Sequence, residues 1–503
     1  MLVSIRAGHD TDPAVISTGD GALRGSLNGS TRQFRGVPYA APPVGDRRWE
    51  RPSPPEKWDK VRDATKAGRR CIQPDDDNER DPRSSEDCLY LDVTAPRSVP
   101  VPVPVMVWFH GGAFSSGAGS DYDPRRLVNQ GRVVVVTVNS RLGVLGYFGG
   151  RGLQDSGTYG LADQQASLSW VKTNSAAFGG DPDRVTIFGN SSGGANVCAH
   201  MASPASQGLY SRAIIQSGSC LQEWREGVMY PDAEPLSYWT SRQQIAKSGR
   251  TAASALGCDT AQPLACLRRV PASKLLSING HFLAMAYGTP LLPHDPRQLL
   301  REGKLHQVPV LQGNTRDEHR LFARFFDIVP TSGAGTYRSL LTKVFPNREA
   351  QLQRLYPRPT GRYSTERAWA AIGTDSSWVC PTLRATRQLS NHASVYSYEF
   401  ADPHPPADPA FPSGFPTGAP HGSEVPYLFD LEPRPHQTRN QRALSDRIIK
   451  YWTTFAAYGS PTKANGWPKA DSSKPKTLQL RPAGDRVIRA DRTHHCWFWL
   501  GPT

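Results

Sequence analysis

The sequence predicts an α/β fold with a large, mostly parallel central sheet that is flanked by helices. Short apolar runs rich in β-branched residues recur along the chain and are bounded by turn residues, as expected of buried strands. A helical pattern separates two of these runs, and strand–helix–strand alternation is typical of a parallel sheet. The runs occupy residues 103–109, 133–138, 184–188, 213–216 and 308–312.

The helical pattern lies between the second and third runs. Leu161, Leu168, Trp170 and Val171 recur at helical spacing within residues 159–173. The chain then meets two glycines and a proline at 179–182, which end a helix. No internal repeat or low-complexity linker divides the sequence, so we expect a single domain over residues 1–503.

Charge and hydropathy exclude several classes of protein. The 59 Lys and Arg exceed the 45 Asp and Glu, a formal net charge of +14, but the basic residues are scattered rather than gathered into runs. We therefore expect a solvated basic surface and no nucleic-acid partner. The longest apolar stretches are far shorter than a membrane helix, so no membrane span is expected.

The eight cysteines are dispersed, and none lies in a CxxC pair typical of zinc or redox sites. An even, dispersed set favours disulfides and therefore an oxidising compartment. Cys71 with Cys88, and Cys258 with Cys266, would each close a short loop, but spacing alone does not select the pairing. We expect a secreted or extracytoplasmic protein, although residues 1–21 lack the pattern of a signal peptide.

A candidate nucleophile follows the run at 184–188. Gly189-Asn190-Ser191-Ser192-Gly193 has the form G-x-S-x-G and stands between a predicted strand and a predicted helix at 195–201. Such a turn requires small neighbours and exposes the serine hydroxyl at the carboxyl end of the sheet. The alternative is a chance match in a chain with 45 glycines, but the strand–turn–helix context favours Ser191 as a nucleophile.

A second candidate element ends the run at 103–109. His110-Gly111-Gly112-Ala113 follows this predicted strand. Small residues let backbone N–H groups approach an oxyanion that develops during acyl transfer. A plain glycine turn is the alternative, but a strand followed by His-Gly-Gly upstream of a nucleophile elbow is the order expected of hydrolases.

A serine nucleophile also needs a base and an acid, expected in the chain order Ser, acid, His. His421 is the best placed of the thirteen histidines, because it follows a Pro- and Gly-rich loop at 401–420. Asp317 and Glu318 both follow the predicted strand at 308–312. Spacing does not decide between these two carboxylates.

These motifs together resemble the type-B carboxylesterase and cholinesterase family, whose fold is the α/β-hydrolase fold with helical and loop insertions around an active-site gorge. The matches run through nearly the whole chain in the same order. They are Phe34-Arg35-Gly36-Val37-Pro38-Tyr39-Ala40, Ser85-Glu86-Asp87-Cys88-Leu89, the His110 segment, Asn139-Ser140-Arg141-Leu142-Gly143, Phe178-Gly179-Gly180-Asp181-Pro182, the elbow, Gln216-Ser217-Gly218, Asp317-Glu318 and His421-Gly422-Ser423-Glu424.

The resemblance implies roles for the candidate residues. Ser191 would be the nucleophile and His421 the base, and Glu318 rather than Asp317 would be the acid. The resemblance places the oxyanion hole at the amides of three residues and gives two others supporting positions around the triad. The oxyanion residues are Gly112, Ala113 and Ser192, and the supporting residues are Asn190 and Ser217.

The resemblance also implies structural pairs. The disulfides would be Cys71–Cys88, Cys258–Cys266 and Cys380–Cys496, which leaves Cys198 and Cys220 unassigned, and we expect these two to be free and buried. Salt bridges are implied for Arg35 with Glu86 and for Arg141 with Asp163.

The implied function is hydrolysis of small carboxylic esters through an acyl-enzyme, with no metal or other cofactor, by a monomer. The chain departs from the family's usual residues at Asn190, which replaces a Glu, at Ser192, which replaces an Ala, and at His319, where a Gly is common. The loop between Cys71 and Cys88 has no aromatic residue to stack on a quaternary ammonium, so choline esters are not expected as substrates. We expect the substrate pocket to draw on residues 281–292 and 321–326.

Overall fold

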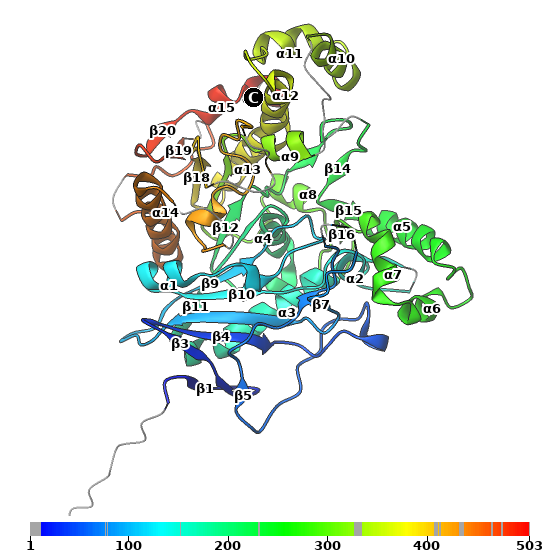
Figure 1. Cartoon of the computed structure of the whole chain (residues 1–503), viewed down its shortest axis with the longest axis vertical. Helices are drawn as coiled ribbons and strands as arrows, with labels where there is room; N and C mark the ends of the chain where they lie inside the picture. The colour runs from blue at the N-terminus through cyan, green and yellow to red at the C-terminus, as the bar shows by residue number, and fades with distance from the viewer. Residues whose placement is uncertain are drawn as a thin grey trace, which may run out of the picture.

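The computed structural model is organised around one 11-stranded mixed sheet (Figure 1). It describes residues 12–75, 77, 79–150, 152–229, 232–325, 334–406, 411, 414–431, 437–463, 466–473 and 476–501. In spatial order the strands are β20 (Arg486–Ile488), β19 (Thr477–Leu480), β18 (Val395–Phe400), β17 (Val310–Thr315), β12 (Arg212–Gln216), β11 (Gly180–Asn190), β9 (Val103–Phe109), β10 (Val134–Val138), β8 (Tyr90–Pro96), β4 (Thr31–Pro38) and β3 (Ser26–Asn28).

The centre of the sheet is parallel and its margins are antiparallel. Strands β10, β9, β11, β12, β17, β18 and β19 pair in parallel, whereas β8, β4, β3 and β20 run antiparallel to their neighbours. All parallel strands therefore present their carboxyl ends at one edge, where functional loops gather in such sheets. The prediction of an α/β fold with a mostly parallel sheet is confirmed.

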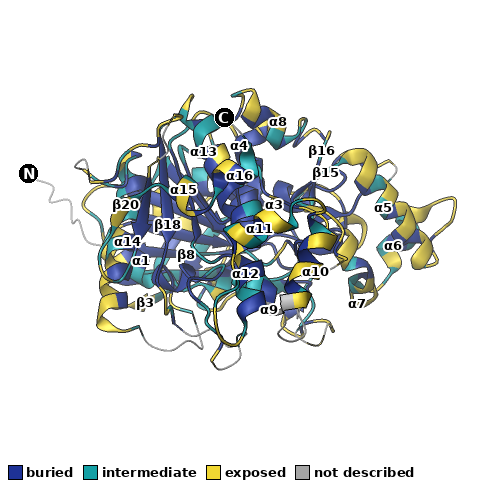
Figure 2. Cartoon of the chain, turned by 90° about the horizontal axis from the view of Figure 1, so that it is seen from above, coloured by how far each residue is buried: buried dark blue, intermediate teal, exposed yellow. Residues whose placement is uncertain are grey.

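Helices cover both faces of the sheet because its central strands are apolar on both sides. In β9, Val105, Val107 and Phe109 join one hydrophobic core, and the alternate residues Met106 and Trp108 join a second. Successive side chains of a strand point to opposite faces, so a continuous apolar run needs a covering layer on each. Figure 2 shows the resulting buried interior and the more exposed outer helices.

One face is covered mainly by α3 (Tyr159–Asn174) and α4 (Ser192–Ala202), and the other by α1 (Arg125–Gly131) and α14 (Arg439–Tyr458). In Figure 1, α5 to α7 project to one side of the sheet, and α10 and α11 lie beyond one end of it. The remaining helices are α2 (Gly143–Tyr147), α5 (Arg242–Ala255), α6 (Pro263–Arg269), α7 (Ala272–Leu275), α8 (Pro296–Arg301), α9 (Arg320–Phe325), α10 (Ala334–Val344), α11 (Glu349–Leu355), α12 (Ser364–Gly373), α13 (Cys380–Ser390), α15 (Ala490–Thr493) and α16 (Cys496–Leu500).

Small sheets lie outside the main one. β1 (Val15–Thr18), β2 (Gly21–Arg24) and β5 (Arg62–Asp63) form one of them near the amino-terminal end. Two short pairs follow β12, namely β13 (Glu223–Trp224) with β14 (Leu236–Ser237), and β15 (Trp239–Ser241) with β16 (Met285–Tyr287). A last pair joins β6 (Arg70–Cys71) and β7 (Ser84–Ser85).

The disulfides correct one expectation. The three pairs implied by the family resemblance are present, and Cys198 is also bonded to Cys220. The expectation that these two thiols are free is wrong. Cys198 lies on α4 and Cys220 lies after β12, two adjacent elements at the carboxyl edge of the sheet, so their Cα atoms come within 5.6 Å.

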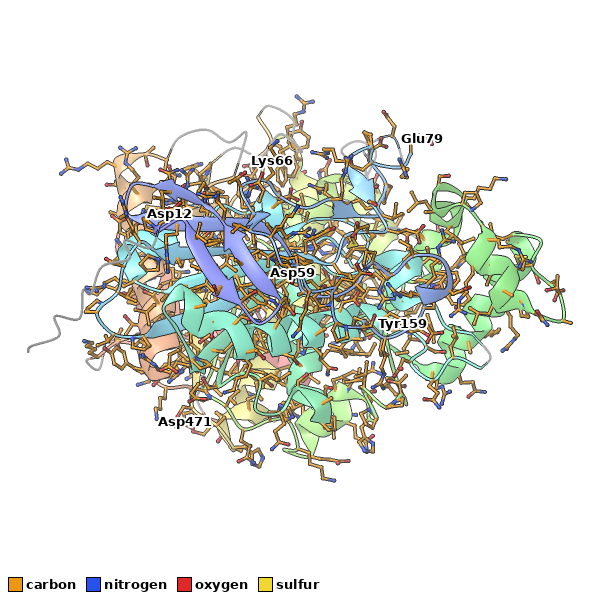
Figure 3. The ribbon with its side chains drawn as sticks, turned by 90° about the horizontal axis from the view of Figure 1, so that it is seen from below. Asp12, Asp59, Lys66, Glu79, Tyr159 and Asp471 are labelled. Carbon is orange, nitrogen blue, oxygen red and sulfur yellow. A yellow bond between two sulfur atoms is a disulfide. The ribbon has the colours of Figure 1, made fainter. Side chains whose placement is uncertain are left out.

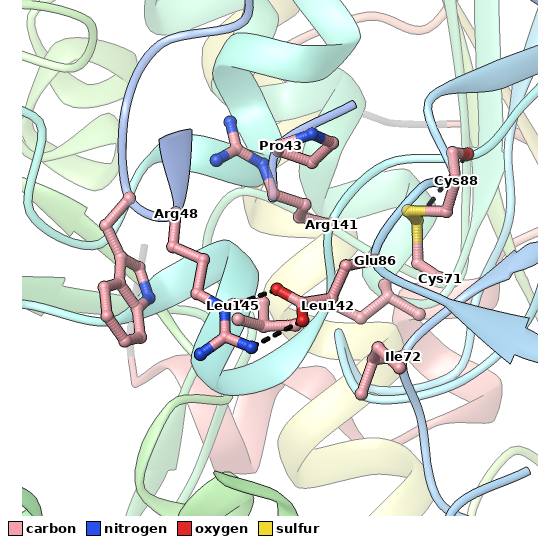
Figure 4. A pocket seen from close by; sticks show the side chains of 10 residues that line it. Pro43, Arg48, Cys71, Ile72, Glu86, Cys88, Arg141, Leu142 and Leu145 are labelled. Carbon is pink, nitrogen blue, oxygen red and sulfur yellow. Dashed lines mark hydrogen bonds and ion pairs between the residues drawn. A yellow bond between two sulfur atoms is a disulfide. The ribbon is translucent and has the colours of Figure 1, made fainter. Parts of the chain in front are cut away.

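One implied salt bridge is also wrong. Glu86 pairs with Arg48, not with Arg35, and Figure 4 shows the Arg48 guanidinium facing both oxygens of Glu86 beside the Cys71–Cys88 disulfide. Arg35 instead pairs with Asp92 at 3.2 Å, because both lie on paired strands, β4 and β8. The buried pair of Arg141 with Asp163 is present at 2.7 Å.

Charged side chains are spread over the surface. Figure 3 shows Asp12, Lys66, Glu79 and Asp471 widely separated around the outside of the molecule, and all four are exposed. Among the described residues, no helix is long and apolar enough to cross a membrane.

Candidate active site

The nucleophile candidate lies in a tight turn between β11 and α4. Ser191 has backbone angles φ 60° and ψ −125°, which place it in a region that L-residues rarely adopt. A side chain on Gly189 would put a Cβ 2.5 Å from Gly193, and one on Gly193 would lie 2.0 Å from the carbonyl oxygen of Phe109. The two glycines of the motif are therefore required because strand and helix approach too closely for any Cβ.

The predicted oxyanion residues surround this turn. Gly112 and Ala113 have positive φ angles of 109° and 52°, in the loop that follows β9. A Cβ on Gly111 would lie 3.2 Å from the Cβ of Ser191, so this loop packs directly against the nucleophile. Within the described chain, no hydrogen bond from the N–H groups of Gly112, Ala113 or Ser192 to another protein group is found, so these three amides stay the predicted oxyanion donors.

Glu318 and His421 are brought together from positions 103 residues apart. Nδ1 of His421 lies 2.6 Å from Oε2 of Glu318, and both side chains are buried. The other carboxylate oxygen accepts hydrogen bonds from the Thr315 N–H at 2.9 Å and from the Asn314 side chain at 3.1 Å. These contacts fix the orientation of the carboxylate toward the imidazole.

The charge state of Glu318 follows from these contacts. Burial raises the pKa of this carboxyl, but His421 and the Thr315 N–H together hold the pKa below its ordinary value. Ser217 is in the left-handed region at φ 50° and is buried, and its supporting role stays a prediction. Glu318 is thus an ionised partner for the imidazole at neutral pH.

Asp317 has a different set of contacts from Glu318. Its carboxylate pairs with Arg316 at 2.7 Å and with Arg320 at 2.8 Å, and it accepts a hydrogen bond from the Ala419 N–H at 2.9 Å. The Asp317 N–H also donates to the Ala419 carbonyl. Asp317 therefore fastens the loop that carries His421 to the loop that carries Glu318, and of these two carboxylates it is Glu318 that bonds to the imidazole.

Asn190 contributes to a buried polar group next to the nucleophile. Its amide donates to Oε1 of Glu424 at 2.8 Å, and Gln216 donates to the same oxygen at 3.2 Å. Burial, together with the charge of Glu318, raises the pKa of Glu424. At a position where the family usually has Glu, Asn190 thus donates to one oxygen of the buried Glu424 carboxyl without adding a charge. Sequence reasoning missed Glu424, although it lies within the quoted His421 segment.

Aromatic rings form a continuous wall around the site, which sequence reasoning largely missed. Trp378 packs on the His421 ring at 4.5 Å between centroids, and Phe322 lies 5.2 Å from the same ring. From Trp378 the wall continues through Trp224 at 5.1 Å to Tyr238 at 5.2 Å and Phe114 at 5.6 Å. These rings come from five separate segments, so no local pattern could have identified them.

The expected pocket ranges are partly represented in this wall. Phe322 belongs to the range 321–326, whereas Phe326 lies outside the described residues. The range 281–292 contains β16, which pairs with β15 next to Tyr238. The Pro- and Gly-rich segment 401–420 before His421 was a useful local signal. No sequence pattern pointed to Trp224, Tyr238 or Trp378.

His319 forms a hydrogen bond with one ring of this wall, the Trp378 indole. Its Nδ1 accepts a hydrogen bond from the Trp378 indole at 3.3 Å, and its Nε2 contacts the Val228 carbonyl at 3.1 Å. Burial lowers the pKa of His319 to about 4, so its ring is neutral near pH 7. Neutral His319, in place of the glycine common in the family, therefore orients the indole that packs on His421.

In the part of the chain that the structure describes, no group of three or more His, Cys, Asp or Glu side chains could hold a metal ion. The polar groups at the carboxyl edge are a candidate serine nucleophile in a strained turn and a buried imidazole–carboxylate pair.

A family model described as the carboxylesterase family matches residues 12–499. The chain belongs to the carboxylesterase family. The para-nitrobenzyl esterase of Bacillus subtilis (strain 168) is 35% identical over 93% of this chain and 94% of that protein. A cholinesterase of Mus musculus is 32% identical over 98% of this chain and 87% of that protein.

Solved structures agree with this placement of the carboxylesterase-family chain. A thermophilic pNB esterase matches it with a TM-score of 0.77 and 31% identity, over 96% of this chain and 99% of that one. The fold is thus the α/β-hydrolase fold, and the enzyme is a carboxylic ester hydrolase.

Proposed function

We propose that this hydrolase cleaves esters through an acyl-enzyme on Ser191, with His421 as the general base and Glu318 as the acid that orients it. The contact between His421 Nδ1 and Glu318 Oε2, at 2.6 Å, carries the proposal. With Nδ1 committed to the carboxylate, Nε2 is the nitrogen free to exchange a proton with the serine. In other triads of this kind, too, one imidazole nitrogen bonds to the carboxylate and the other exchanges a proton with the serine.

The proposed reaction has two steps. Ser191 Oγ attacks the ester carbonyl carbon while His421 takes the hydroxyl proton, and the oxyanion is stabilised by the amides of Gly112, Ala113 and Ser192. His421 returns the proton to the departing alcohol, which leaves the acyl group on Ser191. Water then attacks the acyl-enzyme with the same base, releasing the carboxylic acid and restoring the serine.

The proposed substrates are neutral carboxylic esters rather than choline esters. The similarity to para-nitrobenzyl esterase supports ester substrates with a simple alcohol group. The segment between Cys71 and Cys88 has no aromatic ring to bind a quaternary ammonium, and the site has Asn190 where a carboxylate would attract a cation. We further propose that residues 1–503 act as one domain in a secreted monomer, and the four disulfides support an oxidising compartment.

A covalent probe tests the proposed nucleophile. A fluorophosphonate should label the enzyme once, at Ser191, as read by peptide mass spectrometry, and labelling should stop turnover of p-nitrophenyl acetate. Ser191→Ala should lower turnover by about 10⁴-fold or more, whereas Ser254→Ala, at an exposed serine of α5, should not change it. Labelling at another residue, or an active Ser191→Ala enzyme, would refute the assignment.

A further inference from the structure

A single π-helical turn, Thr374–Val379, joins α12 to α13 beside the proposed triad. Turns of this kind are rare and are often found at functional sites. Near one end of the turn, the Thr374 hydroxyl accepts a hydrogen bond from the His319 N–H of the acid loop at 3.0 Å. Near the other end, Trp378 packs on the His421 ring at 4.5 Å between centroids. The π-helical turn therefore contacts both the acid loop and the base.

Asp375, in the same turn, bonds to a histidine from the carboxyl-terminal segment. Its Oδ1 lies 2.6 Å from Nδ1 of His494, and its Oδ2 accepts a hydrogen bond from the Tyr356 hydroxyl at 2.8 Å. The other nitrogen of this imidazole, Nε2, lies 2.6 Å from Oε2 of Glu399 on β18. The remaining oxygen of Glu399 accepts a hydrogen bond from Gln479 at 2.6 Å. His494 thus bridges the π-helical turn and the central sheet.

The geometry of His494 requires a charged ring. Both of its nitrogens face a carboxylate oxygen, so both donate, and an imidazole with two N–H groups is an imidazolium. Burial alone would lower the pKa of His494, but the charges of Asp375 and Glu399 raise it well above its ordinary value. All three side chains are buried. A buried charge that loses its partner is strongly destabilising, so these groups hold one another in a fixed arrangement.

A disulfide brings His494 to the π-helical turn. Cys380 begins α13 directly after the turn, and Cys496 lies two residues after His494. These two cysteines are bonded, with their Cα atoms 5.2 Å apart. The carbonyl of His494 also contacts Sγ of Cys380 at 3.3 Å. The carboxyl-terminal segment is therefore fixed covalently next to the turn that its histidine contacts.

The two carboxylates lead toward different members of the acid–base pair. Asn314 of β17 lies in register with Glu399 of β18, and its amide donates to Oε1 of Glu318 at 3.1 Å. Asp375 belongs to the turn that carries Trp378. The imidazolium between the carboxylates therefore fixes the spacing between the strands that orient the acid and the turn that packs on the base.

We propose that His494 is a positioning residue of the enzyme, which holds the π-helical turn against the sheet and thereby keeps Trp378 on the His421 ring. The inference rests on the proposed triad. Without the imidazolium, two buried carboxylates lose their common cation, the turn shifts, and Trp378 no longer confines the base. Misplacement of a base lowers kcat with little change in KM, because the lost contact does not act on the bound ester.

Removal and rescue of the imidazole test the proposal. His494→Gly should lower kcat for p-nitrophenyl acetate by about ten-fold or more, with KM unchanged within about two-fold. His494 lines a cavity of about 360 Å³ that reaches the surface at exposed Thr493, so added imidazole can enter the vacated space. Imidazole should then restore most of the lost kcat. Values of kcat are expressed per site titrated with a fluorophosphonate, which excludes unfolded protein.

His495→Gly is the matched control. His495 lines the same cavity, and its φ of 47° suits glycine. In the described part of the chain, the hydrogen bonds and ion pairs of Asp375 and Glu399 to histidine are all made by His494. The control variant should therefore keep the wild-type kcat and should not respond to imidazole.

A second design asks whether the effect passes through Trp378, and it uses His494→Gln, which keeps a polar side chain at this position. His494→Gln should lower kcat by about ten-fold in the wild type but by less than about two-fold in a Trp378→Leu background. Equal losses in the two backgrounds would overturn the inference. An unchanged kcat per titrated site in His494→Gly, or a loss that imidazole does not relieve, would also overturn it. These results would leave the acyl-enzyme on Ser191 intact, whereas fluorophosphonate labelling at another residue would remove the proposed function itself.

Discussion

The nucleophile elbow and the pair of loops that carry Glu318 and His421 meet at one edge of the sheet, but they are built differently. The elbow is one short turn, in which Gly189 lies against Gly193 of the following helix and Gly193 lies against the Phe109 carbonyl of the neighbouring strand β9. The acid and base come from loops 103 residues apart and depend on contacts between them. Substitutions in the elbow should therefore lower stability through backbone strain. Substitutions in the acid–base pair should instead lower activity, because the imidazole loses its orientation.

The largest expected effect separates two adjacent carboxylates in the acid loop. Glu318→Gln should lower kcat by about 10³- to 10⁴-fold, because the amide cannot hold the imidazole in the tautomer that accepts the serine proton. Asp317→Asn should cost only about ten-fold, since Asp317 fastens the His421 loop without touching its ring. Steady-state kinetics with p-nitrophenyl acetate measures both. Equal losses of kcat in the two variants would contradict the distinct roles given to Glu318 and Asp317.

The next effect tests the strain in the elbow. Gly193→Ala should lower the free energy of unfolding by about 3 kcal/mol or more, because its Cβ would meet the Phe109 carbonyl oxygen at 2.0 Å. Gly280→Ala, where a Cβ meets nothing within 4 Å, should change it by less than about 0.5 kcal/mol. Urea unfolding followed by tryptophan fluorescence gives both values. A stable Gly193→Ala protein would mean that strand and helix can separate without cost.

The pH dependence of stability tests the protonation state of His319, which bonds to the Trp378 indole next to His421. Burial lowers the pKa of His319 to about 4, so above pH 6.5 the folded and unfolded states are both neutral at this residue. As the pH falls below 6.5, His319 binds a proton in the unfolded state but not in the folded state, so the free energy of unfolding decreases. Between pH 7 and pH 5 this contribution is about 2 kcal/mol.

His319→Gln should remove this contribution, so its unfolding free energy should fall about 2 kcal/mol less than that of the wild type between pH 7 and pH 5. His294→Gln, at an exposed histidine, should retain the wild-type slope. Urea titrations at the two pH values supply the comparison. Parallel slopes for the wild type and His319→Gln would contradict a neutral, buried His319.

The smallest effect lies between the two regions, at the bond from Asn190 to Glu424. A double-mutant cycle with Asn190→Ala and Glu424→Gln should give a coupling of about 1 kcal/mol in unfolding free energy at neutral pH. The coupling reports the 2.8 Å hydrogen bond that joins the elbow to the His421 loop. Strict additivity of the two single changes would indicate that the two regions are energetically independent at this point.

Much of the fold was predictable because its signals are local. The apolar runs at 103–109 and 213–216 correspond to β9 and β12 almost residue for residue. The run at 308–312 corresponds to β17, which is displaced toward Thr315 because pairing with β18 continues through Phe400. Hydrophobicity shows where a strand is buried, but its ends are set by the neighbouring strand.

The site was predictable where residue type alone restricts the backbone. The tight turn at Gly189 and Gly193 could be predicted from the sequence, because a Cβ at either position would clash. Arg48 could not be identified as the partner of Glu86, because the pairing depends on how the segment after β4 packs against the first disulfide loop. The bond between Cys198 and Cys220 likewise follows from the adjacency of α4 and β12.

The sequence by itself predicted the central strands, the strand–turn–helix elbow and, through the family resemblance, the membership of a hydrolase family, because these signals come from short runs of neighbouring residues. Spacing alone left Asp317 and Glu318 open and the family resemblance implied Glu318, but only the tertiary structure shows that Glu318 faces His421 while Asp317 faces two arginines. Those outcomes are contacts between segments far apart in the chain. Their distances are set by the packing of the whole core, which no local pattern encodes.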